Sequence, residues 1–246
     1  MILELDCGNS WIKWRVVRAN NAGVAFSGVV AGCEQLLQAL LELNALDLRR
    51  CRIVSVRNNV ETQELISQLV QAFKVEVAVA GPVSGVSDVS NGYYEPERLG
   101  VDRWLAVLAA YKLAGGACLV IDVGTAITSD FVVLGGCHLG GYICPGLRLM
   151  GEQLSANTHG IPYLGSGLER VDLLVPGRST AEAVGRGSLL MLRGFIEGQL
   201  QLAPTLLGAQ FQVFLTGGDA ALVGELSVEV RLVPDLVFIG LAVACP

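Results

Sequence analysis

Two short segments carry residues that could do chemistry, and they share one pattern. Each is a largely apolar stretch that ends in an Asp, one further residue, a Gly and then small hydroxyl or amide residues. The first is Asp6-Cys7-Gly8-Asn9-Ser10, and the second is Asp122-Val123-Gly124-Thr125-Ala126. A glycine lets backbone N–H groups approach phosphate oxygens, whereas a carboxylate beside a phosphate needs a bound cation. The pair predicts a site for a polyphosphate with its cation, and hence nucleotide-dependent phosphoryl transfer.

A single Asp-x-Gly is also an ordinary hairpin turn, because both residues tolerate turn geometry. Here each copy is followed by a second strand-like segment, Trp11–Val17 and Ile127–Leu134. Repetition at equivalent places favours duplicated domains over coincidence. We expect two hairpins that hold the polyphosphate between them across a cleft. For Asp122 alone, a turn-capping role and a cation-facing role explain the pattern equally well.

The strand after the first turn places a cation near the predicted phosphate site. Trp11 and Lys13 share one face of a strand and Ile12 takes the other, so Lys13 can point back over the turn while Ile12 packs inward. The alternative is a solvated surface lysine, the usual fate of a lone Lys. The adjoining Asp-x-Gly turn favours the phosphate role.

Gly100-Val101-Asp102-Arg103-Trp104 joins a polar loop to a predicted helix. Asp102 could take a proton from a hydroxyl while Arg103 holds an anion at the same site. The alternative is an ordinary helix start with an Asp in the first turn. Later in the chain, Thr216-Gly217-Gly218-Asp219 could pass flat against an adenine or ribose, or could be a plain strand-to-helix turn.

Composition narrows the class of protein. The chain has 246 residues, a net charge of −6 and 52% hydrophobic residues, which suits two domains of about 120 residues with large cores. The acidic balance argues against nucleic acid as a partner, and no uncharged apolar run reaches the roughly 18 residues of a membrane helix. We find no signal peptide in the sequence and expect the protein in the cytoplasm.

The seven cysteines contain no C-x-x-C pair and there are two histidines, which argues against a structural zinc site. Cys7 lies inside the first turn, and the sequence leaves its reactivity open. Anionic substrates would need local cations, for which the candidates are Lys13, Arg103, Arg148 and Arg186.

The elements that must position these residues form two similar series. In residues 1–115 we expect strands at 2–5, 11–18, 24–30, 52–56 and 75–79, and helices at 34–46, 62–73 (capped by Thr62 or Asn59) and 103–113. In residues 116–246 we expect strands at 119–122, 127–134, 138–143, 212–216 and 228–233, and helices at 145–154, 180–200, from 220 onward and at 235–244. Residues 82–100 read as a functional loop. The fold class is α/β, with a mixed sheet flanked by helices in each half.

Taken in order along the whole chain, these motifs resemble those of type III pantothenate kinases. The motifs are D-x-G-N-[ST]-x-x-K (6–13), a loop Tyr (Tyr93) before G-x-D-R (100–103), D-x-G-T-A-x-T (122–128), G-G-x-I-x-P-G-L (140–147), a Thr before a long helix (Thr180) and T-G-G-D (216–219). Tyr93 fits better than Tyr94 because it stands three residues before Pro96, as in Y-x-x-P.

The resemblance implies two ribonuclease-H-like halves of the actin-like, acetate and sugar kinase superfamily. It implies phosphorylation of pantothenate by ATP with Mg²⁺, the first step toward coenzyme A, in a homodimer that uses potassium or ammonium. Asp102 would be the catalytic base and Asp122 would face the monovalent cation. The ATP residues would be Asp6, Cys7, Gly8, Asn9, Ser10, Trp11, Ile12, Lys13, Thr125, Gly217 and Gly218. The pantothenate residues would be Tyr93, Gly100, Val101, Asp102, Arg103 and Thr180.

Two rival functions stay open. One is a kinase of the same fold for another small alcohol. The other is a nucleotide-gated interaction protein, which would not need the Asp102-Arg103 pair. The apolar stretch from Trp104 to Tyr111 gives independent support for a dimer, because a helix that is apolar all round is buried on every side. Sandwiching between the two halves is the alternative.

Overall fold

The computed structural model describes residues 1–19, 23–43, 46–82, 88–161, 175–223, 226 and 228–246. These residues form two compact units. The first comprises Met1–Ala109 and Asp235–Pro246, and the second comprises Ala110–Pro234. Each unit is described by itself.

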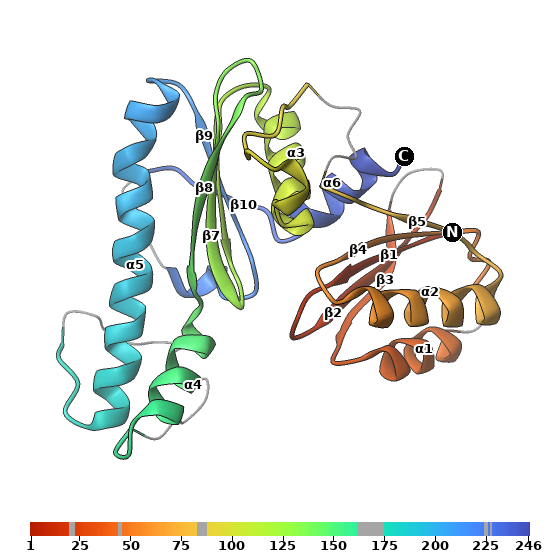
Figure 1. Ribbon diagram of the computed structural model, residues 1–246, viewed down its shortest axis with the longest axis horizontal. Coiled ribbons are helices and arrows are strands. Elements are labelled where there is room, and N and C mark those ends of the chain that lie inside the picture. Colours follow the sequence, from red (N-terminus) through yellow and green to blue (C-terminus); the bar gives the residue numbers. More distant parts are fainter. Residues whose placement is uncertain (20–22, 44–45, 83–87, 162–174, 224–225, 227) are drawn as a thin grey trace. The chain divides into compact units, whose positions relative to one another are not determined.

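The first unit is built on a five-stranded mixed sheet with strand order β3-β2-β1-β4-β5. Its strands are β1 (Ile2–Cys7), β2 (Ile12–Val17), β3 (Val24–Val30), β4 (Arg50–Ser55) and β5 (Glu76–Val79). The first three strands run antiparallel as a meander, whereas β4 and β5 run parallel to β1. Helices α1 (Cys33–Glu42) and α2 (Asn59–Phe73) lie on one face of this sheet (Figure 1). They bury a core with Leu5, Ile53 and Leu69 at its centre.

The remaining elements of the first unit carry candidate site residues or close the sheet. A 3₁₀ turn, η1 (Pro96–Arg98), leads into α3 (Val101–Ala114), within which the boundary between the units falls. The last helix, α6 (Leu236–Ala244), packs against β1 and β4. Gly240 lies against the backbone of Leu105 so closely that a Cβ would collide with it.

The second unit repeats the architecture with strand order β10-β9-β6-β7-β8. Its strands are β6 (Cys118–Val123), β7 (Ala126–Val132), β8 (His138–Pro145), β9 (Gln212–Thr216) and β10 (Arg231–Leu232), and its helices are α4 (Leu147–Asn157), α5 (Thr180–Leu207) and the 3₁₀ turn η2 (Ala220–Val223). The long helix α5 lies along one side of the sheet, where Leu192 and Ile196 join the core (Figure 1).

The two sheets share one topology, which confirms the expected internal repeat. In each, a three-stranded antiparallel meander is extended by two parallel strands on the side of its first strand. The strands β1 and β6, which end in the two Asp-x-Gly turns, are therefore the central strands of their sheets.

The division into units differs from the expected boundary at residue 115, because α6 belongs to the first unit. A buried charge network explains why. Glu4 is 1% exposed and accepts from Arg15 at 2.6 Å and from Arg52 at 2.8 Å. Arg15 also pairs with Asp235 at 3.0 Å, and its guanidinium lies 4.6 Å from the ring centroid of Phe238. These contacts fasten the start of α6 to the first sheet.

Several predicted elements have different bounds. α2 begins at Asn59 because Asn58 caps it, accepting from the backbone N–H of Glu61 at 2.9 Å, so the predicted caps were wrong. α1 ends earlier, at Glu42, and α5 runs on through Pro204 to Leu207. The helix expected from Ala220 is, in the described residues, the 3₁₀ turn η2, and the last strand of the second sheet is only two residues long.

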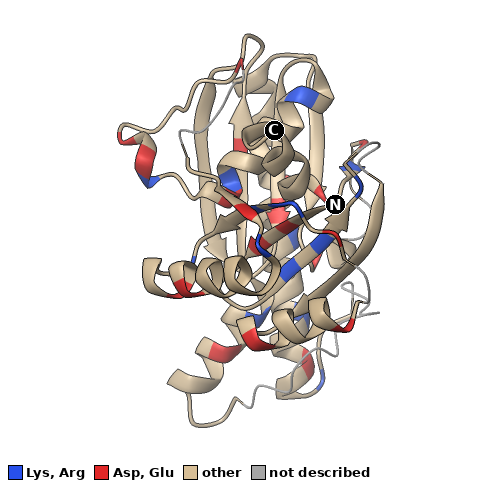
Figure 2. Ribbon diagram, turned by 90° about the vertical axis from the view of Figure 1, so that its right-hand side faces the viewer, with Lys and Arg blue, Asp and Glu red and all other residues tan. Residues whose placement is uncertain are grey.

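Charged residues of both signs are spread over the described helices and strands (Figure 2). Among the described helices, none is long and apolar enough to span a bilayer.

Candidate active site

The first Asp-x-Gly turn joins the central strand β1 to β2. Asp6 is paired in register with Lys13, so the carboxylate and the ammonium lie on the same face of the sheet. Ile12 is fully buried and Trp11 is 52% exposed, which confirms the predicted alternation. A cation and a carboxylate therefore flank the glycine of this turn.

Asp6 has an unusual electrostatic environment. Burial raises its pKa from 3.8 to about 6; the charge of Lys13 opposes this shift and the charge of Asp102 adds to it. Asp102 must therefore be close enough for its charge to act on Asp6. The first turn and the start of α3 thus contribute to one electrostatic site within the first unit.

Cys7, whose reactivity the sequence left open, is an inert residue. It is 1% exposed, and burial raises the pKa of its thiol to about 12. The thiolate is the reactive form, so Cys7 stays protonated and packs as a small hydrophobe.

Asp102 is the second residue of α3, and the geometry of the preceding turn depends on a glycine. A Cβ on Gly100 would lie 2.8 Å from Oδ1 of Asp102. The same Oδ1 accepts from the backbone N–H of Arg103 at 2.8 Å. The sequence G-x-D-R thus fixes a carboxylate at the N-terminal end of a helix.

Tyr93 and Arg103 form a pair beside Asp102. Arg103 is 7% exposed and donates from Nη1 to the hydroxyl of Tyr93 at 2.6 Å, with its guanidinium 5.6 Å from the ring centroid. Tyr94 is fully exposed. These contacts support Tyr93 rather than Tyr94 as the residue at the site.

Asn91 holds the loop that carries Tyr93, and sequence reasoning missed it. Its Oδ1 accepts from the backbone N–H of Tyr93 at 3.0 Å, and its Nδ2 donates to the carbonyl of Pro96 at 3.1 Å. This is an Asx-turn, in which a side chain replaces a backbone partner. The Asn-Gly pair before Tyr93 was the available signal.

The second Asp-x-Gly turn is packed against the glycines that follow β9. Gly217 has φ +100°, and a Cβ there would lie 2.5 Å from Oδ1 of Asp122 and collide with the carbonyl of Val123. The backbone N–H of Asp219 donates to that same carbonyl at 2.9 Å. Only glycine fits at position 217. Gly218, by contrast, is exposed.

Pro145-Gly146, within the G-G-x-I-x-P-G-L motif, completes the second turn. The N–H of Gly146 donates to the carbonyl of Thr125 at 2.9 Å, and there is no room for a Cβ on Gly146. The side chain of Thr125 is exposed. Burial raises the pKa of Asp219, and the positive charge of Arg148 opposes that shift. Asp122, Thr125, Arg148 and Asp219 therefore belong to one region of the second unit.

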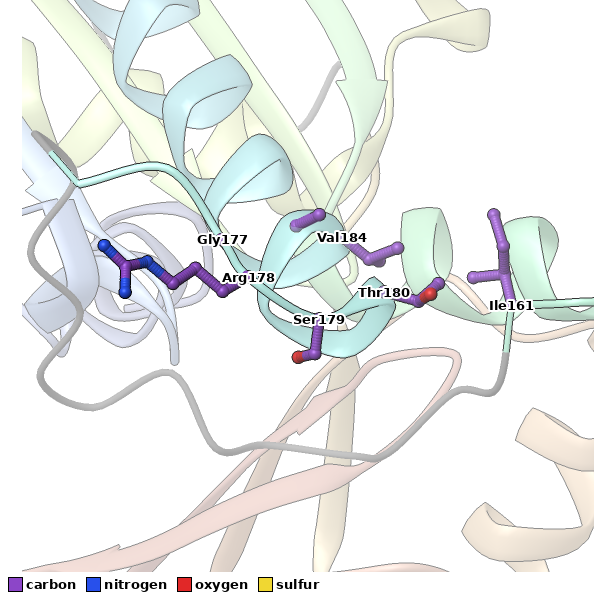
Figure 3. A pocket seen from close by; sticks show the side chains of 7 residues that line it. Ile161, Gly177, Arg178, Ser179, Thr180 and Val184 are labelled. Atoms are coloured by element: carbon purple, nitrogen blue, oxygen red, sulfur yellow. The ribbon is translucent and has the colours of Figure 1, made fainter.

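Thr180 lies at a different place in the second unit. It is the first residue of α5 and lines an open hollow of about 710 Å³ together with Ile161, Gly177, Arg178, Ser179, Ala183 and Val184. The side chains of Thr180 and Ile161 lie on the same side, whereas the guanidinium of Arg178 points away from them (Figure 3). Ser179 caps α5 through the N–H of Glu182.

Within the described ranges, no group of three or more His, Cys, Asp or Glu side chains is arranged so that it could hold a metal ion. A cation at either Asp-x-Gly turn would therefore share its coordination between one carboxylate and ligands such as backbone carbonyls, hydroxyls, water or a bound phosphate.

Solved structures with the same fold come from proteins of diverse function. A Baf family protein from Campylobacter jejuni aligns with a TM-score of 0.57 and 19% identity, over 98% of this chain and 96% of that one. A protein from Sinorhizobium meliloti described as a 2-dehydro-3-deoxygalactonokinase also aligns at 0.57, with 15% identity over 99% and 98% of the chains. This likeness confirms the expected fold of two ribonuclease-H-like halves, each a mixed sheet flanked by helices.

Sequence relatives identify the family. The model of the type III pantothenate kinases matches residues 2–202. Type III pantothenate kinases of Pseudomonas putida and Pseudomonas fluorescens are each 54% identical to this chain over 247 aligned residues, covering 100% of this chain and 99% of theirs. The chain belongs to the type III pantothenate kinase family.

Proposed function

We propose that this chain phosphorylates the hydroxyl group of pantothenate with ATP, the first step of coenzyme A biosynthesis, and that the residues of the two units described above carry the reaction. Family membership supports the reaction. The single observation that supports the residues is that the charges of Lys13 and Asp102 both act on Asp6. A phosphate-binding turn, a cation and a carboxylate at a helix start then belong to one site.

Asp102 acts as the general base in this proposal. It takes the proton from the pantothenate hydroxyl as the oxygen attacks the γ-phosphorus of ATP; the bond from that phosphorus to the bridging oxygen breaks, and ADP leaves with the electron pair. Gly100 supports this role because any side chain there would displace the carboxylate.

The first turn binds the ATP phosphates. Backbone N–H groups of residues 7–10 donate to phosphate oxygens, and Lys13 adds a positive charge beside them. Asp6 would help to hold the Mg²⁺ that accompanies ATP, and the charge of that cation would offset the cost of ionising a buried carboxylate. In the second unit, Thr125 binds phosphate and Gly217-Gly218 pass against the adenosine.

Asp122 would hold a monovalent cation, potassium or ammonium, which would supply positive charge beside the phosphates. The fit is favourable, because Asp122 is paired in register with Thr128, a hydroxyl residue, and its Oδ1 lies against Gly217. For pantothenate we propose contacts from Tyr93, the segment 100–103 and Thr180.

Turnover of ATP with and without pantothenate tests this function. We expect ADP release to rise sharply when pantothenate is added and to require Mg²⁺, with 4′-phosphopantothenate as the product. Other small primary alcohols at the same concentration are the matched control. Pantothenate would be excluded as the specific acceptor if those alcohols stimulated ATP turnover equally, or if pantothenate did not change ATP turnover.

We also propose a two-fold homodimer, but on different residues from those that the sequence suggested. Trp104–Ala110 are already buried within one chain, so α3 is no argument for a partner. The support comes instead from the second unit, where Leu190 and Met191 on α5 are 59% and 65% exposed. Tyr142 and Ile143 are exposed on β8, an edge strand of its sheet. Large exposed apolar side chains of this kind are common in obligate interfaces.

Light scattering at micromolar concentration tests the assembly. We expect twice the chain mass of 26.0 kDa for the wild type, and a monomer for Met191→Asp. Val60→Asp, on an equally exposed residue of α2, is the control and should stay dimeric. A fully active 26.0 kDa species would overturn the dimer. We place the protein in the cytoplasm, with no nucleic acid or membrane partner.

A further inference from the structure

The side chain of Arg57 reaches the first phosphate turn from a neighbouring strand. Arg57 follows β4, the parallel neighbour of β1, and donates from Nε to the carbonyl of Gly8 at 2.9 Å. Nη2 of the same guanidinium approaches the carbonyl of Ala31 at 3.5 Å. One planar group thus reaches the glycine of the turn and the segment that follows β3.

The guanidinium is itself held in place. The side chain of Arg57 is 13% exposed, and its backbone N–H donates to Oγ of Ser55 at 3.2 Å. That hydroxyl in turn shares a hydrogen bond of 2.8 Å with Thr62 on α2. The contact with Glu61, at 3.9 Å, is a half-exposed ion pair of little energetic weight. The bond to the Gly8 carbonyl is therefore the shortest specific contact of this side chain, and the 3.5 Å contact with Ala31 accompanies it.

The bond to the Gly8 carbonyl has a geometric consequence for the turn. A trans peptide unit is planar, with its C=O and the following N–H on opposite sides. A carbonyl directed at Arg57 therefore directs the N–H of Asn9 away from Arg57. Without a partner, Gly8 has the freedom of a glycine and could rotate this peptide. A rotated peptide would present a carbonyl oxygen, which repels phosphate, in place of a donor.

We infer that Arg57 is a positioning residue for ATP: it orients the Gly8–Asn9 peptide so that its N–H is available to a phosphate oxygen. The inference rests on the proposed assignment of residues 6–13 to the ATP phosphates. The positive charge of Arg57 also acts near the turn, since it lowers the pKa of Cys7 against the larger effect of burial. Arg57 thus adds positive potential beneath the turn in addition to fixing its backbone.

Steady-state kinetics of Arg57→Met, which keeps an apolar stem but removes every donor, tests the inference. We expect KM for ATP and the dissociation constant of a non-hydrolysable ATP analogue, measured by calorimetry, to rise about tenfold, the usual effect of losing a charge-assisted hydrogen bond. KM for pantothenate should stay within about twofold. Arg57→Lys can make one hydrogen bond but not two, so its KM and dissociation constant should lie between those of the wild type and those of Arg57→Met.

Arg50→Met is the matched control. Arg50 also donates to a backbone carbonyl of the first unit, that of Pro246 at 2.6 Å, but at the far end of β4. It should leave both KM values unchanged. The inference is overturned if Arg57→Met binds the analogue like the wild type, or if both KM values rise together with a lower melting temperature, as a merely structural role requires. If Lys13→Met also leaves ATP binding unchanged, the assignment of the turn itself fails, and that result is distinct from a failure confined to Arg57.

Discussion

The two Asp-x-Gly turns occupy equivalent positions in two sheets of the same topology, yet they differ in charge. In the first, the residue paired in register with the aspartate is Lys13; in the second it is Thr128. The duplicated scaffold therefore keeps the carboxylate and exchanges its neighbour. A lysine beside Asp6 suits direct contact with phosphate, whereas a hydroxyl beside Asp122 suits a bound cation.

The next strand continues this difference. After β4, the first turn is fastened by the side chain of Arg57; after β9, the second is fastened by backbone, through Gly217 and the N–H of Asp219. The same fold thus positions the first turn with the guanidinium of Arg57. It positions the second turn by packing two backbone segments of the chain closely together. The symmetry of the fold therefore does not extend to the charged side chains at its two turns.

The largest expected effect comes from a residue that only the first unit has. Asp102→Asn keeps the size and hydrogen bonds of the side chain but cannot take a proton. We expect kcat to fall by a factor of about 10² to 10⁴ with little change in pantothenate binding. Asp88→Asn, at an exposed position of the same loop region, is the control. Activity within a few-fold of the wild type would exclude Asp102 as the base.

The glycines should respond differently in the two turns. Gly217→Ala forces a side chain onto φ +100° and into the Val123 carbonyl, so we expect a loss of about 1–3 kcal/mol in the free energy of unfolding. Gly8→Ala should cost less, because its Cβ would lie 3.3 Å from one carbonyl, that of Trp11. Gly218→Ala, with open space around it, is the control. Denaturant unfolding ranks the three, and equal losses would contradict the contrast.

Asp6 should make the first turn sensitive to pH. Because its folded pKa of about 6 exceeds the unfolded value of 3.8, the folded state binds more protons between these pH values. The contribution of Asp6 to stability is therefore lost as pH rises from about 4 to 6. Asp6→Asn should melt at a higher temperature than the wild type at pH 7.5 and at a similar one near pH 4, while its use of ATP is impaired.

Melting curves across that pH range, with Asp88→Asn as the reference, check the sign. An Asp6→Asn variant that is less stable than the wild type at pH 7.5 would show that the attraction between Asp6 and Lys13 outweighs the cost of burial.

Gly8→Val should also impair ATP use, because its side chain would block the approach of the backbone to phosphate. If Asp6→Asn and Gly8→Val both fold and turn over ATP normally, the phosphate role of the first turn is refuted.

The smallest effect is expected at Asn91. Asn91→Ala removes both hydrogen bonds of the loop around Tyr93 and should raise KM for pantothenate by a few-fold, with KM for ATP unchanged. Asn91→Asp keeps the acceptor for the N–H of Tyr93 and should recover part of the loss. An equal effect on both substrates would assign Asn91 to folding alone.

The repeat and its strands could be predicted because their signals are local. Alternation at Trp11, Ile12 and Lys13 fixed which side chain is buried, and the Asp-x-Gly pattern located the ends of both central strands. The membership of α6 could not be predicted, because it depends on Arg15, which pairs with Glu4, also pairing with Asp235, 220 residues further along the chain. An ion pair between residues so far apart in the chain leaves no periodicity in the sequence.

Some residues of the candidate site could likewise be predicted from the sequence, and others could not. Asp6, Lys13 and Asp102 were predicted from their types and spacing, and the charges of the other two act on Asp6. Arg57 and Asn91 were missed, since an arginine after a strand and an asparagine before a glycine are common on any surface. Both side chains bond to backbone carbonyls or N–H groups. Nearly every residue carries such groups, so the sequence does not show which of them a side chain will contact.

The order of the units along the chain has a consequence for synthesis on the ribosome. Residues 110–234 are continuous, so every residue of the second unit is synthesised before the last helix. The first unit, begun earlier, lacks α6 until Asp235–Pro246 emerge. Until then Arg15 lacks its partners Asp235 and Phe238, and the face of β1 and β4 that α6 covers is uncovered. The half whose synthesis begins first is thus the half whose synthesis is completed last.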